Sequence, residues 1–421
     1  MKRIKKILSY IGPGFITGAS DDDPSGIATY AQTGAQFGYS QLWMALFSLP
    51  FMTIIQEMCG RIGMVTGQGI AGVMRRHYSK KLLYVTVTIL LIANTINIGA
   101  DLGAMAASAN LVFKLPFVVW VLGMTIITLV LEVFVSYKTY AKFLKYLTFS
   151  LFAYIITVFI VKQDWRAVAA STLVPHISFT QDYIMNVVAF LGTTISPYLF
   201  FWQANEEVEE EIAENKLERM GYGKPHITNR DIRHMRVDTF IGMFFSNIVT
   251  FFIIITCAST LGAHGLRDIQ TADQAAQALR PFAGNAAFLL FALGIIGTGL
   301  LAVPVLAGAA SYAIAEAFQW RAGLYRKFEQ AHGFYGVITI ATLIGLLVNF
   351  TPVKPFQLLY YTAVLNGIVA PPLMVLILLI SNNKKVMGTR VNNTAQNMFG
   401  WLITILMTLA SLALIFSLVR K

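Results

Sequence analysis

The sequence predicts an all-α membrane protein of about eleven transmembrane helices. Of its 421 residues, 56% are hydrophobic and only 13% are charged, whereas soluble domains usually carry about 25% charged residues. The apolar residues form runs long enough to cross a bilayer, which takes roughly 17 to 25 residues per helix. Because lipid offers the backbone no hydrogen-bond partners, such runs have to form helices that satisfy their own peptide groups.

Short polar loops separate the apolar runs and define the expected spans in chain order. We expect spans near residues 10–37, 41–64, 82–112, 116–136, 143–162, 183–213, 238–259, 284–318, 334–350, 356–381 and 396–418. The first, sixth and eighth of these are long or interrupted. The first and sixth spans open two successive groups of five, so equivalent positions in the two halves can be compared.

The basic residues predict the orientation of the helices. A net charge of +11 could indicate a nucleic-acid-binding protein, but Lys and Arg lie in short loops between apolar runs, where orientation signals are expected. With a cytoplasmic N-terminus, 24 of the 32 basic residues fall on the cytoplasmic side. They lie in the leader at 2–6 and in segments 61–81, 137–145, 214–236, 319–333 and 382–395. We therefore expect a multi-pass protein of the inner (cytoplasmic) membrane that contacts the lipid bilayer and binds no nucleic acid.

No catalytic or cofactor motif stands out in the sequence. It contains no glycine-rich phosphate loop, nucleophile elbow or His/Cys zinc pattern, and we expect Cys59 and Cys257 to be small buried hydrophobes. The most polar segment, 206–236, begins with EEVEEE. It is interpreted either as a metal-collecting cluster or, preferably, as a solvated helix end. We expect no enzyme, no cofactor and no obligate protein partner.

The most informative segment lies inside the first expected span, at Asp21-Asp22-Asp23-Pro24-Ser25-Gly26. A carboxylate at membrane depth costs at least about 2.5 kcal/mol to insert, so it needs a reason. Proline removes a backbone donor and pushes the preceding residue out of helical geometry. The segment therefore predicts an unwound break with Asp23 beside exposed carbonyl groups. Asp21 and Asp22 either lie nearer the surface or line a path for metal or protons.

The sixth span contains a second predicted break, at residues 192–197, where Gly-Thr-Thr-Ile-Ser-Pro interrupts the apolar run. Proline kinks also occur in membrane helices that have no binding site. The equivalent positions of the two breaks favour a function, because interrupted segments at matching places in two halves mark the binding site of many transporters. Unwound carbonyl groups coordinate cations at such sites.

Several motifs resemble the Nramp family of divalent metal transporters. Gly12-Pro13-Gly14-Phe15 resembles the start of that family's first helix, and Asp23-Pro24-Ser25-Gly26 is similar to its Asp-Pro-Gly-Asn break. Gln56-Glu57, followed by Arg61, Gly63, Thr66-Gly67 and Gly69, resembles the second helix and the loop after it. The resemblance covers most of the chain and is strongest over 11–75, and residues 294–318 resemble the divergent prokaryotic branch.

The resemblance implies a LeuT-like fold, as in amino-acid/sodium symporters, with two inverted five-helix repeats and with helices 1 and 6 broken. On this chain we expect a single transporter domain, 1–421, made of a first repeat at 1–162, a second at 183–381 and an extra helix at 396–418. The resemblance also implies an ion bound between helices 1 and 6. Asp23 matches the family's metal-binding aspartate, and Ser20 and Thr193 match positions whose backbone carbonyls contact the metal.

Two departures from the family pattern bear on the choice of metal. The family's asparagine falls on Gly26, and its sixth-helix methionine falls on Ser196. Thioether ligands favour softer metals, whereas carboxylate, carbonyl and water suit Mg²⁺, Ca²⁺ and Mn²⁺. Mg²⁺ usually keeps several of its waters, so a roomier all-oxygen site suits it. The same two changes resemble Nramp-related magnesium transporters, and we expect Mg²⁺, and also Mn²⁺, as the substrate.

Proton coupling is expected to be weak or absent. Asn94, Asn97 and Asp101 are spaced i, i+3 and i+7 and so share one helix face. The resemblance places a family glutamate at Asp101, a family aspartate at Ile98 and a family histidine at Tyr198. An imidazole titrates near neutral pH and a phenol near pH 10, so Tyr198 is a poor proton carrier. The Asn/Asp stripe is either a proton path or a set of interhelical polar contacts.

The expected mechanism is alternating access, in which a hydrated cation meets Asp23 and exchanges some waters for oxygens of Ser20, Thr193 and Ser196. The first alternative is a proton-coupled Mn²⁺/Fe²⁺ importer, which Asp101 favours. A sodium-coupled amino-acid symporter on the same fold is less consistent with three clustered aspartates. A membrane enzyme is more distant still, and a structural or receptor role leaves Asp23 unexplained.

Overall fold

The computed structural model describes residues 12–135 and 149–419, and all regular secondary structure in this part of the chain is helical. In order the helices are α2 (Pro13–Asp21), α3 (Pro24–Phe37), α4 (Trp43–Thr66), α5 (Ile70–His77), α6 (Lys80–Val112), α7 (Phe117–Phe134), α9 (Phe152–Ile160), α10 (Trp165–Leu173), α11 (Gln181–Thr194), α12 (Pro197–Ala213), α13 (Asn229–Thr260), α14 (Ala272–Ala276), α15 (Arg280–Ala283), α16 (Ala287–Phe318), α17 (His332–Val348), α18 (Pro355–Asn382), α19 (Lys384–Met387) and α20 (Thr394–Val419). The predicted all-α class is confirmed.

Seven helical segments among the described residues are long and apolar enough to cross a membrane. They contain α6, α7, α11 with α12, α13, α16, α18 and α20. The other expected spans correspond to shorter or more polar helices, namely α2 with α3, α4, α9 and α17. The first part of the expected fifth span, 143–148, lies outside the described residues. The count of eleven spans therefore stays a prediction.

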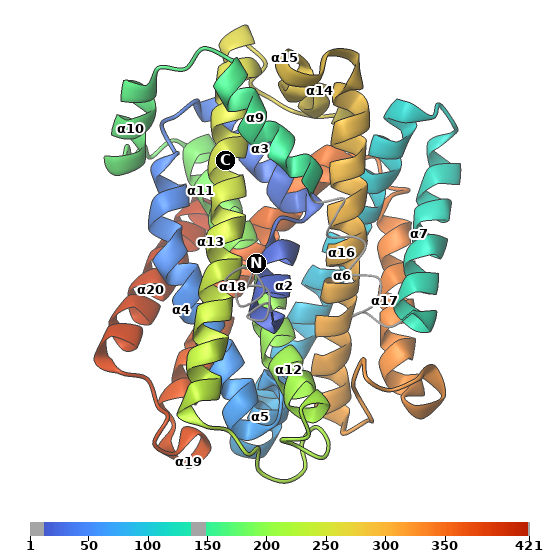
Figure 1. Ribbon diagram of the computed structural model, residues 1–421, viewed down its shortest axis with the longest axis vertical. Helices are drawn as coiled ribbons and strands as arrows, with labels where there is room; N and C mark the ends of the chain where they lie inside the picture. Colours follow the sequence, from blue (N-terminus) through green and yellow to red (C-terminus); the bar gives the residue numbers. More distant parts are fainter. Residues whose placement is uncertain (1–11, 136–148, 420–421) are drawn as a thin grey trace, which may run out of the picture.

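The interrupted helices lie inside the bundle, as Figure 1 shows for α2, α3 and α12 near its centre. Helix α13 packs against both α2 and α3, α11 packs against α18, and α12 packs against α4 and α16. Helices α7 and α20 lie at the edge (Figure 1) and expose large apolar side chains such as Ile126 and Leu409. Apolar residues thus face outward at the periphery, while the interior holds the two breaks.

Glycine residues allow the interrupted helices to approach their neighbours closely. A Cβ atom on Gly18 of α2 would lie 2.2 Å from the carbonyl carbon of Gly242 on α13. On Gly192 of α11 it would lie 2.1 Å from the carbonyl oxygen of Ala363 on α18. Small residues permit such close contacts between membrane helices. Gly18 and Gly192 therefore allow α2 and α11 to pack closely against the long helices α13 and α18.

The basic segments gather at one end of the molecule. Helices α5 and α19 lie at the lower end in Figure 1, together with the chain after α12 and before α17, whereas α10, α14 and α15 lie at the upper end. This arrangement agrees with the alternation of loops that the charge count assumed. The basic residues counted in segments 2–6 and 137–145 lie outside the described residues, and the cytoplasmic N-terminus stays a prediction.

Helix α13, which corresponds to the seventh expected span, begins earlier than the sequence predicted, at Asn229 instead of near residue 238. Thr228 and Asp231 form a capping box at its start, with the Thr228 backbone N–H 2.7 Å from the Asp231 Oδ2. A capping box satisfies backbone N–H groups of the first turn, so the helix extends into a charged stretch. Arg230, Arg233 and Arg236, which the sequence had placed in a loop, therefore belong to α13.

Candidate functional site

The first helix is broken between Asp21 and Pro24, as predicted. Pro24 opens α3 at a position where its missing N–H costs nothing. Asp23 precedes it with extended backbone, φ −67° and ψ 169°, as expected before a proline. Its Oδ1 accepts hydrogen bonds from the Gly26 N–H at 2.6 Å and the Ser25 hydroxyl at 2.7 Å. Asp23 is therefore the N-cap of α3, and its carboxylate lies inside the break.

The sixth helix is broken at the predicted place, between Thr194 and Pro197. Ser196 has extended backbone, and its hydroxyl donates to the Thr193 carbonyl at 2.6 Å and lies 3.2 Å from the Gly192 carbonyl. The last carbonyls of a helix have no intrahelical partner. Ser196 thus partly satisfies the C-terminal end of α11 at the break.

The two breaks meet at Gly26. A Cβ atom built on Gly26 would lie 3.1 Å from the carbonyl oxygen of Asp21, 3.1 Å from Oγ1 of Thr193 and 3.3 Å from Oδ1 of Asp23. Oxygens from both broken helices therefore converge on one point next to Gly26. This point is at bonding distance from the Gly26 Cα, so an ion has to bind farther from Gly26, with its oxygen ligands at about 2.1 Å for Mg²⁺ or 2.3–2.6 Å for Ca²⁺. The expected roominess beside Gly26 is not present in this conformation.

Tyr198 links the second broken helix to the first. Its hydroxyl donates a hydrogen bond to the Ser20 carbonyl at 3.1 Å, and α2 and α12 lie together in the centre of Figure 1. A carbonyl oxygen has two lone pairs, so Ser20 keeps one for a further partner. The structure thus places Ser20, Ser196 and Tyr198 at the two breaks.

The three polar residues that share one face of α6, Asn94, Asn97 and Asp101, differ in their contacts. The Asn97 amide donates to Oδ2 of Asp23 at 3.2 Å and so joins the break. The Asn94 amide donates to the Leu306 carbonyl on α16 at 2.9 Å, which is an interhelical contact. Asp101 is buried within electrostatic range of Asp23, and among the described residues neither of its carboxylate oxygens has a hydrogen-bond partner.

Asp21 and Asp22 are 0% and 2% exposed, so their predicted alternative placement near the surface is wrong. Ser246 of α13 lies between them, with its hydroxyl 2.8 Å from Oδ2 of Asp21 and 3.2 Å from Oδ1 of Asp22. A hydroxyl has one proton to donate, so it serves one carboxylate at a time. In the described part of the chain, no Lys or Arg pairs with Asp21, Asp22, Asp23 or Asp101.

Four buried carboxylates without basic partners lie in this region, namely those of Asp21, Asp22, Asp23 and Asp101. An isolated buried charge is unfavourable unless it is neutralised or coordinates a cation. No group of three or more His, Cys, Asp or Glu side chains in the described residues is arranged to hold a metal ion. The oxygens that meet at Gly26 are instead one carboxylate, one hydroxyl and one backbone carbonyl. Such a hard-oxygen set suits Mg²⁺, Ca²⁺ or Mn²⁺.

Asp238 supports the site although the sequence did not single it out. Its carboxylate, on α13, accepts from the N–H groups of Gly12 at 2.9 Å, Gly14 at 2.7 Å and Phe15 at 3.3 Å. These groups form the start of α2 and lack intrahelical acceptors. Asp238 therefore fixes the first half-helix to α13. More than 220 residues separate the partners, so no local pattern predicts the contact.

The acidic residues of α12 also differ from expectation. Glu206, Glu207, Glu209 and Glu211 are all buried, so the preferred interpretation as a solvated helix end is wrong for them. Oε1 of Glu209 accepts from the hydroxyl of Tyr312 and from the Leu324 N–H at 2.5 Å. Glu207 accepts from the Gln203 amide at 2.8 Å. The helix continues as a buried element beyond the point where its sequence turns acidic.

Two known proteins resemble this chain along almost its whole length. The divalent metal cation transporter MntH of Clostridium acetobutylicum is 22% identical over 436 residues, covering 99% of this chain and 92% of that protein. The divalent metal cation transporter MntH of Deinococcus radiodurans is 24% identical over 416 residues, covering 96% and 88%.

Solved structures share the fold. The crystal structure of the Eremococcus coleocola manganese transporter superposes with a TM-score of 0.75 at 18% identity, over 97% of this chain and 86% of that chain. The nucleobase-cation-symport-1 family transporter Mhp1, in a closed conformation, gives a TM-score of 0.59 at 13% identity, over 96% and 91%. The model of the family described as Nramp, natural resistance-associated macrophage protein-like, matches residues 14–417. This protein therefore belongs to the Nramp family of multi-pass membrane transporters.

Proposed function

We propose that this protein carries a divalent metal cation across the cytoplasmic membrane by alternating access, with its N-terminus in the cytoplasm. The observation that supports this most strongly is the convergence of oxygens from Asp21, Asp23 and Thr193 beside Gly26, where two broken helices meet. Transporters of several folds place their coupling ions at such breaks. The names of the MntH relatives state the same substrate class.

The proposed substrate is Mg²⁺, with Mn²⁺ also accepted. The side chains and carbonyls at the breaks offer oxygen ligands. By the sequence resemblance, Ser196 stands where the family has methionine, so the soft sulfur ligand is missing. Oxygen ligands suit hard cations that retain part of their water shell. Neither Gly26 nor Ser196 supplies a long side chain, so the ion keeps water molecules on that side once the breaks separate slightly.

Ion binding exchanges internal hydrogen bonds for contacts to the cation. Oδ1 of Asp23 releases its bonds to Gly26 and Ser25 as it turns to the ion, while Asn97 keeps its bond to Oδ2 and holds the carboxylate in place. Carbonyls of Ser20 and Thr193 each have a second lone pair available. Asp21 and Asp22, both buried next to the break, add negative potential that attracts the ion. The broken helices then move against the rest of the bundle, with Gly192 and Pro197 near the pivot.

Proton coupling is proposed to be weak. By the sequence resemblance, Tyr198 stands where the family has histidine, and an unperturbed phenol titrates near pH 10. One observation favours the proton-coupled Mn²⁺/Fe²⁺ alternative: the buried, unpartnered carboxylate of Asp101 near Asp23. A sodium-coupled amino-acid symporter fits less well, because Asp23 already caps the α3 N-terminus that would bind a substrate carboxylate.

The test is metal uptake into proteoliposomes that contain an indicator for Mg²⁺ or Mn²⁺, with and without a pH gradient. Asp23→Ala should abolish uptake of both ions. The matched control is Glu132→Gln, which neutralises another buried carboxylate, on α7 at the edge of the bundle. This control should retain uptake close to that of the unmodified protein.

Mg²⁺ uptake that does not respond to pH and is lost in Asp23→Ala supports the proposal in full. Uptake of Mn²⁺ alone, accompanied by proton movement, would replace it with the proton-coupled alternative. Uptake that survives in Asp23→Ala would mean that the ion does not pass between the two breaks.

A further inference from the structure

A large cleft opens at the end of the molecule where the basic segments gather. Its volume is about 940 Å³, within the range of roughly 300–1,000 Å³ that is typical of small-molecule sites. Three segments form it: α5 with Gln68 before it, residues 219–223 after α12, and residues 316–326 at the end of α16 and beyond. Since they follow three different transmembrane helices, only the tertiary fold brings them together.

Arginine dominates the lining of this cleft. Five arginines face it, namely Arg75, Arg76, Arg219, Arg321 and Arg326. Glu316 is the one acidic residue among the described residues that line it. Its two oxygens accept hydrogen bonds from the N–H groups of Gly69 at 2.6 Å and Gly72 at 2.9 Å, at the start of α5. The positive charge of the cleft is therefore largely uncompensated.

The guanidinium groups retain many free donors. Each arginine carries five N–H donors, yet the protein uses few of them here. Arg76 donates to the Gly221 carbonyl at 2.5 Å, Arg326 donates to the Ala322 carbonyl at 3.2 Å, and Arg75 donates to the Ala317 carbonyl. Arg219 lies 3.5 Å from the centre of the Tyr222 ring. Within the described residues Arg321 is exposed, and no hydrogen bond or ion pair engages it.

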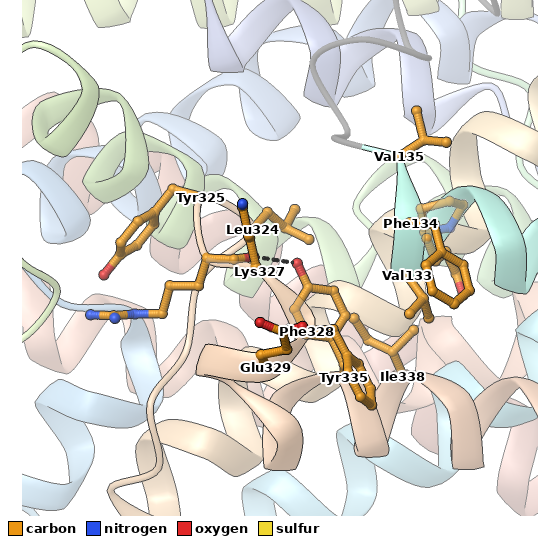
Figure 2. A pocket seen from close by; sticks show the side chains of 13 residues that line it. Val133, Phe134, Val135, Leu324, Tyr325, Lys327, Phe328, Glu329, Tyr335 and Ile338 are labelled. Carbon is orange, nitrogen blue, oxygen red and sulfur yellow. Dashed lines mark hydrogen bonds between the residues drawn. The ribbon is translucent and has the colours of Figure 1, made fainter.

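The cleft adjoins the pocket drawn in Figure 2 and shares Tyr325 and Arg326 with it. That pocket, about 430 Å³, lies among α7, α16 and α17 and contains Glu132 and Glu329 as well as basic residues. Tyr335 donates a hydrogen bond to the Arg326 carbonyl at 2.7 Å there, and Tyr325 points away from Tyr335 in the figure. Tyr325 thus lies between the mixed-charge pocket and the arginine-rich cleft, and only the cleft has a strong excess of one charge.

We propose that the arginine-rich cleft binds an anion that carries phosphate groups. Guanidinium groups match phosphate oxygens with paired, charge-assisted hydrogen bonds. Five arginines from three segments surround a volume suited to a small molecule, and a ligand with one or more phosphates engages donors from all three segments at once. Such chemistry is offered by soluble polyphosphates and by the headgroups of anionic phospholipids.

The experiment measures binding to the full-length protein, purified in neutral detergent without phosphate. Pyrophosphate is titrated in one arm, by calorimetry. In the other arm the protein is placed in nanodiscs of phosphatidylcholine with phosphatidylglycerol, and the phosphatidylglycerol retained after extraction and washing is measured by mass spectrometry. The test variant is Arg219→Gln/Arg321→Gln, both exposed positions in the cleft. The matched control, Arg230→Gln/Arg233→Gln, removes the same charge from exposed positions at the start of α13.

Pyrophosphate affinity that falls about tenfold or more, equal to about 1.4 kcal/mol, in the cleft variant but not in the control assigns the cleft to a soluble phosphate ligand. Loss of retained phosphatidylglycerol in the cleft variant alone assigns it to a lipid headgroup. The proposal is overturned if neither probe binds, or if the control loses binding as much as the cleft variant does. In the latter case the surface attracts anions only through its general positive field. Arg321→Lys, which keeps the positive charge, should retain more of the binding than the Arg219→Gln/Arg321→Gln variant does.

Discussion

Asn97 of α6 donates a hydrogen bond to Asp23 at the helix break, over 3.2 Å and across 74 residues of sequence. This contact joins the broken first helix to a long helix of the surrounding bundle. It also supplies a donor to Oδ2, the carboxylate oxygen that the Gly26 N–H and Ser25 hydroxyl do not reach. The position of the Asp23 carboxylate therefore depends on α6 as well as on its own break.

Asn97→Ala should weaken metal binding by about tenfold or more, because a hydrogen bond to a charged group contributes about 1.5–3 kcal/mol. The measurement is the concentration dependence of uptake in proteoliposomes. Asn94→Ala is the matched control, since Asn94 lies one turn away on α6 and bonds to Leu306. A similar loss of affinity in both variants would show that the hydrogen bond from Asn97 to Asp23 does not specifically support metal binding.

Gly26→Ala should strongly reduce transport. The added methyl carbon would occupy the point where oxygens of Asp21, Thr193 and Asp23 approach within 3.1–3.3 Å, so an ion could no longer reach all three. Gly123→Ala on α7 is the control, because its added methyl meets nothing within 4 Å. Normal uptake in Gly26→Ala, with normal expression of both variants, would place the ion elsewhere.

Ser196→Met should raise the preference for Mn²⁺ over Mg²⁺ by about tenfold, or roughly 1.4 kcal/mol, because a thioether favours the softer ion. Competition between the two ions in the uptake assay measures this preference. Ser196→Leu separates the effect of sulfur from that of size, since leucine and methionine have similar volumes. Equal selectivity in the two variants would argue against direct contact between position 196 and the ion.

Tyr198→His should make uptake depend on pH. The tyrosine hydroxyl contacts the Ser20 carbonyl, so a histidine here lies beside the proposed ion. Imidazole with an ordinary pKa of about 6.5 gains a proton as pH falls, and its positive charge then repels a divalent cation. Uptake should therefore fall as pH decreases from about 7.5 to 5.5. Tyr198→Phe, which cannot titrate, should give a flat profile, and a flat profile in both would remove Tyr198 from the ion path.

Arg61→Gln should lower thermal stability far more than Arg236→Gln. Both arginines pair with Glu57, at 3.0 Å and 2.8 Å, but the Arg61 side chain is 2% exposed and that of Arg236 is 47% exposed. Breaking a buried pair costs about 3–5 kcal/mol, whereas exposed pairs contribute about 0–1 kcal/mol. Arg61 also donates to Asn392 at 2.6 Å, which joins α4 to the chain before α20. Thermal unfolding in detergent measures the difference, and equal shifts would contradict it.

Local chemistry was sufficient to locate the two breaks. Asp23 before Pro24 and Ser196 before Pro197 cannot continue a regular helix, because proline lacks an N–H and constrains the residue before it. These effects act over one or two residues, so the sequence alone reveals them. The all-α class follows in the same way from apolar runs that must satisfy their own backbone in lipid.

Boundaries and burial were less predictable where charges are dense. The sequence placed the start of the seventh span near residue 238, but the capping box of Thr228 and Asp231 begins α13 at Asn229. Glu207 and Glu209 were expected in solvent, yet both are buried. Glu207 accepts a hydrogen bond from Gln203 of its own helix, and Glu209 accepts one from Tyr312 of α16. Composition alone cannot distinguish a charge that faces water from one that faces a distant side chain.

The sequence by itself determined that this chain forms membrane helices, where two of them break, and which oxygen-bearing residues lie at the breaks. Only the tertiary structure decided that Asn97 holds Asp23, that Tyr198 reaches Ser20, that Asp238 caps α2, and that five arginines surround one cleft. The difference has a physical cause. A break is a property of a few neighbouring residues, whereas these contacts join residues from about 70 to more than 220 positions apart, which only the packing of whole helices brings together.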